Sequence, residues 1–234
     1  MKKIQAMSRA AGHVDKILLE KFPRWIHEGV TEQQIFDQLC EAIRAGGEYE
    51  LSFDPIVAFG SGGAEPHHEP TNYALSPGDT ILIDCGAIFD GWCSDCTRMF
   101  SFGEPSAKFL QKYGTLLAVH EATLPKFISG AECAALDMEV REDLAEDASF
   151  FIHTLGHGVG SEVHVSPRIG KDSLEILKPG DVVTCEPGLY FPGEFGIRIE
   201  DQLVIQEKES PEIITTCSRE LAIIDSDGRV TYRR

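Results

Sequence analysis

The chain has 234 residues and a mass of 25.8 kDa, enough to bury roughly 70–75% of its unfolded surface without disulfides or metal. Its 21 lysines and arginines face 38 aspartates and glutamates, which gives a formal net charge of −17. This balance argues against nucleic acid or an anionic membrane surface as the main partner. With 42% hydrophobic and 25% charged residues, the composition is that of a folded globular protein.

The predicted elements alternate between helical and extended blocks. Apolar spacing predicts a helix over 3–21, and a capping box of Thr31 with Gln34 opens a second helix that ends near Gly46-Gly47. Extended segments cover about 52–102 and 150–206, two helices cover 106–127 and 133–146, and a short strand-like tail follows. The pattern predicts an α+β fold. No linker interrupts it, so we expect one domain over 1–234.

The N-terminus and the cysteines indicate a compartment. No apolar stretch follows Lys2-Lys3, so we expect no secretory signal, and no run approaches the length of a membrane span. The seven cysteines are scattered, which fits a reducing, cytoplasmic location. Cys93 and Cys96 form a C-x-x-C, but in a strand over 91–100 they point to opposite faces, which disfavours a shared metal or disulfide.

A short internal repeat points to two related halves. Leu75-Ser-Pro-Gly-Asp79 recurs as Leu177-Lys-Pro-Gly-Asp181. In each copy the turn starts a β-rich run that meets a carboxylate at the same offset, Asp84 and Glu186. One hypothesis is two similar halves that deliver acids to a shared centre; the alternative is chance recurrence of a common Pro-Gly-Asp turn.

Two predicted hairpins determine where these acids point. With Asp90-Gly91 as a two-residue turn, Asp84 faces Thr97, and Asp84 and Asp95 share a face with backbones roughly 7–8 Å apart. A register shift of one residue would reverse the faces.

With a loop over 192–194, Glu186 faces Glu200 and Arg198 shares that face. Asp201 then points the other way and is structural or solvated.

Four acids that interrupt hydrophobic runs need compensation if they are buried together. Solvated acids on an exposed face are the simpler interpretation for any one of them. Burial with metal fits the group better, and oxygen ligands with an added imidazole favour Mn, Fe, Co or Zn. His157, bracketed by glycines, is the best candidate for that imidazole, while His164 and the pair His67-His68 lie in turn-rich segments. His13, His27 and His120 are expected to be ordinary.

These residues resemble the methionine aminopeptidase, prolidase and creatinase superfamily, whose fold is called the pita bread. The resemblance runs from about residue 50 to 206, and the spacing of Arg198-Ile-Glu-Asp and of Glu186 to Tyr190 is closest to the Xaa-Pro branch. The motifs that carry it are Pro66-His67, Ile83-Asp84-Cys85-Gly86-Ala87, Ser94-Asp95-Cys96-Thr97-Arg98, Gly156-His157-Gly158-Val159-Gly160, Val163-His164, Cys185-Glu186-Pro187-Gly188 and Arg198-Ile199-Glu200-Asp201.

The resemblance implies a dinuclear centre of two divalent cations, with Mn favoured over Co, Fe or Zn. Asp84 binds one metal, and His157 and Glu186 bind the other. Asp95 and Glu200 bridge both. The residues implied in catalysis are His67 and His164, which act on the scissile carbonyl, and Glu186, which transfers a proton.

The resemblance also implies supporting residues. Arg168 falls where prolidases carry an arginine that receives a dipeptide's carboxylate, and a surface arginine is the alternative. His153 resembles a histidine of the outer shell, and Tyr190 belongs to the Xaa-Pro-like run. Arg198 is expected to support Glu200 electrostatically because the predicted hairpin puts both on one face. Two features depart from the family: Val165 follows His164 where many relatives have Glu, and most Xaa-Pro enzymes carry an N-terminal domain for which this chain has no room.

The expected function is hydrolysis of an N-terminal peptide bond, as in an Xaa-Pro aminopeptidase or prolidase. A methionine aminopeptidase or a non-peptidase member such as a lyase or amidinohydrolase is one alternative. A non-catalytic peptide- or protein-binding module is another, although such modules usually lose metal ligands. The expected partners are a peptide substrate and, in a homodimer, a second copy, with no nucleic acid and no membrane.

Overall fold

The computed structural model describes residues 2–234, which form two similar halves around two five-stranded sheets. The helices are α1 (Lys2–Lys16), α2 (Glu32–Arg44), α3 (Ala107–Thr123) and α4 (Cys133–Asp143). Single helical turns lie at Ile17–Lys21, Phe22–Arg24, Gly60–Ala64, Leu124–Lys126 and Ala145–Phe150. Among residues 2–234, no helix combines the length and apolar character needed to cross a membrane.

Each five-stranded sheet is built mainly from one half of the chain, except that the C-terminal strands join the sheet of the first half. The first has the order β15-β14-β6-β3-β2 and the second β13-β12-β9-β7-β8, beside a small sheet β1-β4-β5 and a hairpin β10-β11. The strands are β1 (Glu50–Leu51), β2 (Ile56–Phe59), β3 (Thr80–Cys85), β4 (Ala87–Phe89), β5 (Trp92–Cys93), β6 (Cys96–Phe102), β7 (Gly156–Gly158), β8 (Val165–Ile169), β9 (Val182–Cys185), β10 (Gly188–Phe191), β11 (Phe195–Arg198), β12 (Asp201–Val204), β13 (Glu212–Ile213), β14 (Leu221–Ile224) and β15 (Val230–Arg233). The C-terminal β14 thus returns to the first half.

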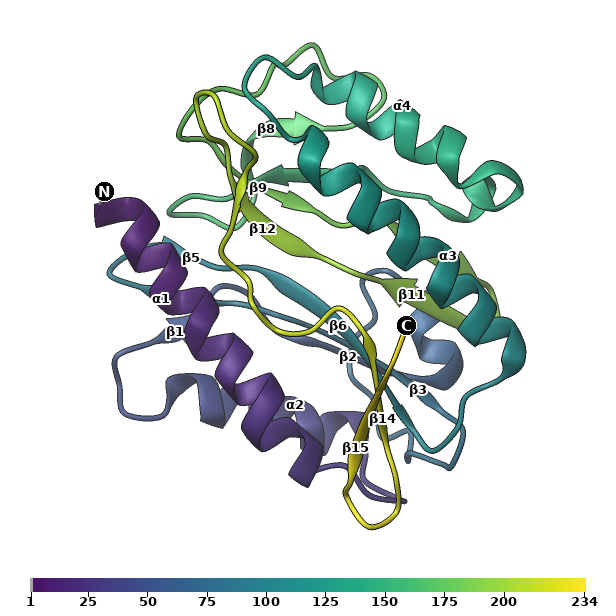
Figure 1. The fold of residues 1–234 in the computed structure, drawn as a ribbon. Coiled ribbons are helices and arrows are strands. Elements are labelled where there is room, and N and C mark those ends of the chain that lie inside the picture. Colours follow the sequence, from purple (N-terminus) through teal and green to yellow (C-terminus); the bar gives the residue numbers. More distant parts are fainter. Residues whose placement is uncertain (1) are drawn as a thin grey trace.

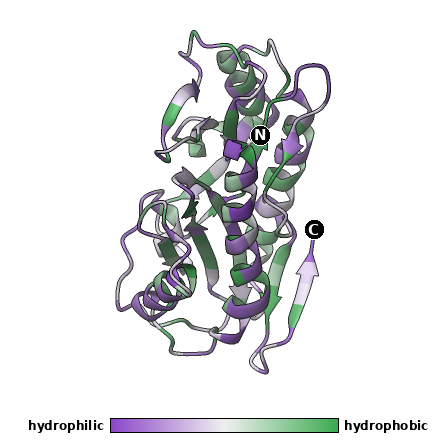
Figure 2. Ribbon diagram, turned by 90° about the vertical axis from the view of Figure 1, so that its left-hand side faces the viewer, coloured by the Kyte–Doolittle hydropathy of each residue, from purple (hydrophilic) through white to green (hydrophobic). Residues whose placement is uncertain are grey.

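Two helix pairs flank the strands. In Figure 1, α1 and α2 lie at the lower left of the strands and α3 and α4 at the upper right. The core has two main clusters, one under α1 and α2 and one under α3 and α4. In β3, Ile81 and Ile83 enter the first cluster while Leu82 enters the second, as strand alternation requires. In Figure 2 the hydrophobic colour gathers on the central strands, whereas the loops are largely hydrophilic. Each helix pair therefore covers its own part of the core.

The predicted helices are confirmed, with adjusted ends. The Thr31 hydroxyl accepts from the Gln34 amide at 3.2 Å, and the Gln34 side chain accepts from the Thr31 amide at 2.9 Å, which is the predicted capping box. The helix ends at Arg44, and Gly46 and Gly47 follow with φ of +88° and +72°. The α+β class is likewise confirmed.

The internal repeat is structural, so the chance interpretation is wrong. Asp79 and Asp181 each accept, at 2.8 Å, from the amide three residues earlier. The turn glycines Gly78 and Gly180 each donate to the strand that runs beside their own, at 2.7 and 2.9 Å. Both halves therefore use the same turn to aim a central strand at the same place.

The first hairpin has the predicted register but not the predicted continuity. Asp90 and Gly91 have φ of +49° and +78°, and Asp84 pairs with Thr97. The expected strand over 91–100 is wrong, because it breaks at Ser94 and Asp95 into β5 and β6. At the break, the Ser52 hydroxyl donates to the Ser94 carbonyl at 2.8 Å, and the Asp95 amide donates to the Gln202 side chain at 3.2 Å.

The second hairpin follows its prediction. Phe191 pairs with Phe195 across the three-residue loop, and Gly188 pairs with Arg198. Farther along, Cys185 pairs with Asp201 in the same frame. Glu186 and Glu200 therefore stand at opposite positions on the two strands.

Candidate metal centre and substrate cleft

A cleft with a volume of about 990 Å³ lies where the two halves meet. It collects nearly all of the side chains singled out from the sequence. Those lining it are His67, Asp84, Asp95, His153, His157, His164, Arg168, Glu186, Arg198 and Glu200. Tyr190 is buried and bonds to two of them. The sequence-derived set is thus one spatial cluster.

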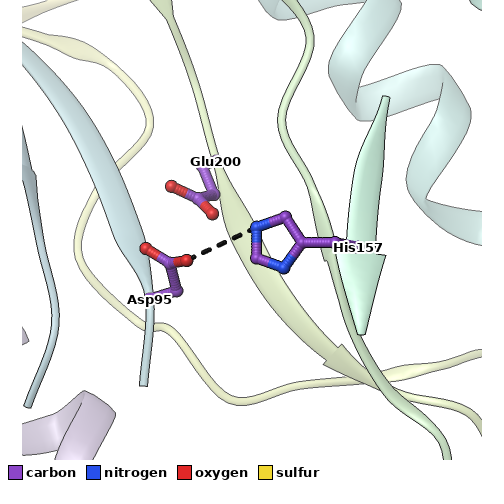
Figure 3. Close-up of side chains that lie close together, drawn as sticks. All are labelled: Asp95, His157 and Glu200. Atoms are coloured by element: carbon purple, nitrogen blue, oxygen red, sulfur yellow. Dashed lines mark ion pairs between the residues drawn. The ribbon is translucent and has the colours of Figure 1, made fainter. Parts of the chain in front are cut away.

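Three side chains converge at the bottom of the cleft. Asp95, His157 and Glu200 each offer one ligand atom, and these atoms lie within 4.8 Å of one another (Figure 3). Asp95 sits between β5 and β6, His157 on β7, and Glu200 directly before β12. His157 Nε2 lies 3.6 Å from Asp95 Oδ2. The two halves thus contribute jointly to a point where a cation fits.

Glu186 faces the same nitrogen of His157 as Asp95 does. Its Oε1 is 3.2 Å from His157 Nε2 and accepts from the Thr184 hydroxyl at 3.1 Å. Burial opposes ionisation of Glu186, but the hydrogen bond and charge of His157 outweigh it and lower the pKa to about 2. Glu186 is therefore a carboxylate at neutral pH.

The His157 ring is oriented by its own backbone. Nδ1 lies 3.1 Å from the Gly158 carbonyl, to which it donates, so Nε2 faces Asp95 and Glu186. This arrangement is typical of a metal-ligating histidine. Burial lowers the pKa of His157, but the neighbouring Glu186 raises it to a net value above the usual one. A proton and a cation would compete for Nε2.

Asp84 has one satisfied and one unsatisfied oxygen. Arg198 donates to Oδ2 at 2.7 Å. Oδ1 is buried and has no hydrogen-bond partner among the residues that the structure describes. Burial raises the pKa of Asp84 although Arg198 acts against it. An acceptor oxygen left open inside a cleft of acids is a position that a cation would satisfy.

Ionisation is strongly disfavoured for Asp95 and Glu200. Burial raises the pKa of both well above the usual range, and the neighbouring carboxylates raise it further. Glu200 accepts from the Thr97 hydroxyl at 2.7 Å. Sequence reasoning missed Thr97, although its predicted pairing with Asp84 could have revealed it. The charge of Arg198 lowers the pKa of both acids but does not outweigh burial and the neighbouring carboxylates.

A hydrogen-bonded chain leads from Asp84 to the cleft wall. Arg198 donates to the Tyr190 hydroxyl at 2.8 Å, and that hydroxyl lies 2.8 Å from His153 Nε2. A guanidinium only donates, so Tyr190 accepts from Arg198; His153 Nδ1 donates to the Thr154 carbonyl at 2.8 Å, so Nε2 of the neutral ring accepts from Tyr190. Burial raises the pKa of Tyr190 to about 12 and lowers the pKa of His153. The network holds Arg198 in place with neutral partners.

The rim carries the exposed members of the set. His164 packs edge-on against His157 with ring centroids 4.3 Å apart, and His67 is exposed to the cleft. Burial and the charge of His157 lower the pKa of His164. Arg168 is half exposed and donates to Asp172 at 2.6 and 2.7 Å. These side chains can reach a ligand without further opening.

A second buried cluster lies behind β12. Arg98 donates to Asp201 at 2.7 Å, Arg219 also donates to Asp201, and His120 Nε2 lies 3.4 Å from it. Burial opposes ionisation of Asp201, but the charges of Arg98 and Arg219 hold its pKa well below the usual range. Asp201 is thus structural, and the solvated alternative is wrong. His120 is not ordinary either, since burial lowers its pKa to about 4.

The comparisons with known proteins agree with this geometry. Residues 6–207 match the model of metallopeptidase family M24. The chain belongs to this family. It is 34% identical over 224 residues to a protein named probable dipeptidase PepE of Mycobacterium tuberculosis, covering 94% of this chain and 59% of that one. It is 37% identical over 215 residues to a putative Xaa-Pro aminopeptidase of Mycoplasma genitalium, covering 88% and 59%.

A solved structure shows the same fold. The X-Pro aminopeptidase from Thermotoga maritima superimposes with a TM-score of 0.91 at 36% identity, over 95% of this chain and 63% of that one. The chain therefore has the pita-bread fold of the family. It spans about three fifths of the length of these relatives.

Proposed function

We propose that the chain is a dinuclear metal-dependent peptidase that hydrolyses the bond after an N-terminal residue, with a preference for Xaa-Pro substrates. The observation that carries the proposal is the convergence of Asp95, His157 and Glu200 beside an open oxygen of Asp84. Four carboxylates and one imidazole in a cleft fit a divalent cation site. The names of the relatives support the choice of substrate.

The ligands divide by position. Asp84 would hold one cation, and His157 with Glu186 the other, which agrees with the 3.2 Å contact between the latter two. Asp95 and Glu200 would serve both, as the family resemblance implies, and their ligand atoms converge with that of His157. Oxygen ligands with one imidazole suit Mn, Co, Fe or Zn, and we favour Mn.

When bound, the cations would supply Lewis acidity that acidifies a water and polarises the scissile carbonyl. The side chains of the chain do the rest. Glu186, ionised at neutral pH, accepts a proton and delivers it to the leaving amine. His67 and His164 at the rim donate hydrogen bonds to the carbonyl oxygen, each worth about 2.7–4 kcal/mol as charge develops there.

Other groups hold the substrate and the ligands. Arg168 would exchange Asp172 for the carboxylate of a short peptide, since both side chains are exposed. Arg198 orients Asp84, and Tyr190 with His153 orients Arg198. Together these contacts fix the orientation of Asp84 relative to the wall of the cleft.

Compartment and domain organisation are part of the proposal. All seven cysteines are free and buried, which supports a reducing, cytoplasmic location. A third cluster contains Met7 and Cys93 of the first half and Val182 of the second, which supports folding of the chain as one domain.

The proposal is tested with metal-loaded protein and a panel of Met-Ala, Ala-Pro and Xaa-Pro-Xaa peptides. We expect release of the N-terminal residue from the proline-containing peptides, dependent on added Mn and lost with a chelator. Cleavage of Met-Ala alone would indicate a methionine aminopeptidase. Failure of the loaded protein on every peptide would leave a non-peptidase or a binding module and reject the proposal.

A further inference from the structure

A buried carboxylate outside the metal cluster, Glu32, holds one wall of the cleft. Glu32 is the first residue of α2 and its side chain is 1% exposed. It accepts four hydrogen bonds: from the Phe59 amide at 2.7 Å, the Thr71 amide at 2.9 Å, the Thr71 hydroxyl at 2.6 Å and His68 Nε2 at 3.0 Å. All four donors belong to residues 59–71.

Residues 59–71 form a segment that leaves the end of β2 and returns towards the Pro-Gly turn before β3. We call it the His67 segment, because it presents His67 to the cleft, together with Pro66, His68, Glu69 and Pro70. Glu32 holds the beginning of the segment through Phe59 and its end through Thr71. One side chain thus closes a loop of the backbone.

His67 lies between two anchored neighbours. The Pro66 carbonyl accepts from Arg198 at 3.3 Å, and His68 is held by Glu32. A carboxylate accepts hydrogen bonds and donates none. His68 therefore presents a proton at Nε2 towards Glu32. The backbone on both sides of His67 is therefore held, once from each half of the molecule.

The segment also has little room to move towards α2. A Cβ on Gly62 would lie 3.0–3.2 Å from the His68 ring and the Glu32 carboxylate. A Cβ on Gly63 would lie 3.2 Å from the Gly196 amide of β11. The segment therefore has little slack, and its position is defined jointly by this packing and by the Glu32 contacts.

We propose that Glu32 is a positioning residue for His67, and this inference rests on the proposed role of His67 at the scissile carbonyl. A carboxylate offers acceptors to all four donors, whereas an amide offers one acceptor oxygen and brings its own N–H groups. A neutral side chain at this position leaves part of the donor set unpaired and frees the segment. Misplacement of a catalytic group by about 1 Å costs on the order of 100-fold in rate.

The test is Glu32→Gln, measured together with His67→Ala and the double variant. We expect Glu32→Gln to lower kcat/KM on an Ala-Pro peptide by about 10- to 100-fold, mainly through kcat. In the His67→Ala background the same change should cost less than about twofold, because the residue it positions is gone. Equal losses in both backgrounds, or no loss in the wild type, overturn the proposal.

Two further variants keep the test interpretable. Thr71→Val removes one donor and leaves the other residues of the set in place, so we expect a smaller loss in the same direction. Glu50→Gln changes an exposed acid paired with Arg44 and should leave kcat/KM unchanged. A wild-type value for Thr71→Val together with failed folding of Glu32→Gln overturns the proposal.

Hydrogen exchange provides a readout that does not depend on activity. We expect Glu32→Gln to accelerate amide exchange in residues 59–71 while exchange in β7 and the Mn content stay as in the wild type. If the wild-type protein cleaves no peptide, the proposed function fails but this measurement still tests the positioning. Unchanged exchange in the segment, or acceleration throughout the molecule, overturns it.

Discussion

Glu200 and Asp201 are neighbours in sequence, both are buried, and they behave in opposite ways. Asp201 faces Arg98, Arg219 and His120, and its pKa is held below the usual range. Glu200 faces the cleft, where other carboxylates surround it, and its pKa is raised well above the usual range. Strand alternation sends the two side chains to opposite sides of β12.

The difference shows what distinguishes a structural acid from a candidate cation ligand. Burial is common to both clusters, so burial alone is uninformative. The cluster behind β12 contains its own positive charge and is complete. The cluster in the cleft contains four acids and only Arg198 and His157 against them. The missing charge, not the acids themselves, marks the site.

The largest expected effect is on the complete cluster. Asp201→Asn leaves Arg98 buried without its counter-charge and should lower the free energy of unfolding by about 3–5 kcal/mol. Because the loss is structural, it should be the same with a chelator and with Mn. Urea denaturation under both conditions measures it, and a loss below about 1 kcal/mol would mean that the two clusters do not differ as described.

The incomplete cluster should respond to cations instead. Adding Mn at about 100 times its dissociation constant should stabilise the wild type by about 2.7 kcal/mol, by mass action. Glu200→Gln should lose this gain, because it removes a ligand shared by both proposed positions. Thermal melting with chelator and with Mn tests the pair of proteins. An unchanged wild-type melting temperature would count against the site.

The pH dependence of the free energy of unfolding should also distinguish the cluster in the cleft. An acid whose pKa is raised on folding contributes stability below its unfolded value, about 4, and that contribution is lost as pH rises through the folded value. Asp95 and Glu200 therefore destabilise the chelated protein progressively as pH rises above about 4. Glu186, with a pKa of about 2, is constant over this range. Urea titrations at several pH values should show a slope that Mn reduces; a flat chelated profile would contradict it.

The smallest effect is expected at the rim. The Arg168–Asp172 ion pair is exposed on both sides, with side chains 50% and 68% accessible. Asp172→Asn should change the free energy of unfolding by less than about 1 kcal/mol. If Arg168 receives a substrate carboxylate, the same variant should lower KM for a dipeptide but not for a longer peptide. Steady-state kinetics on Ala-Pro and Ala-Pro-Ala distinguishes these results.

Local patterns predicted much of this arrangement. The Asp90-Gly91 turn and the three-residue loop determine the registers, and the registers determine which acids share a face. The capping box and the repeated Pro-Gly-Asp turn are likewise short-range features. Such features can be identified from sequence because the atoms that interact lie within a few residues of one another.

The misses all involve contacts between distant segments. The Ser52 hydroxyl donates to the Ser94 carbonyl where the predicted strand breaks, and the sequence around either residue does not predict this contact. His120 lies on an unremarkable helix, yet it meets Asp201 across the core. Glu32 belongs to no motif identified in the sequence, although it positions the His67 segment. Strand alternation assigns each side chain to a face of the sheet, but it does not identify the distant side chain that contacts it there.

The two halves exchange partners across their boundary. Arg198 of the second half holds Asp84 of the first, while Thr97 and Arg98 of the first hold Glu200 and Asp201 of the second. Neither half alone can present its acids in their final orientation. A complete cation site therefore exists only after the halves have docked, so metal uptake during refolding would report the last event of assembly rather than the first.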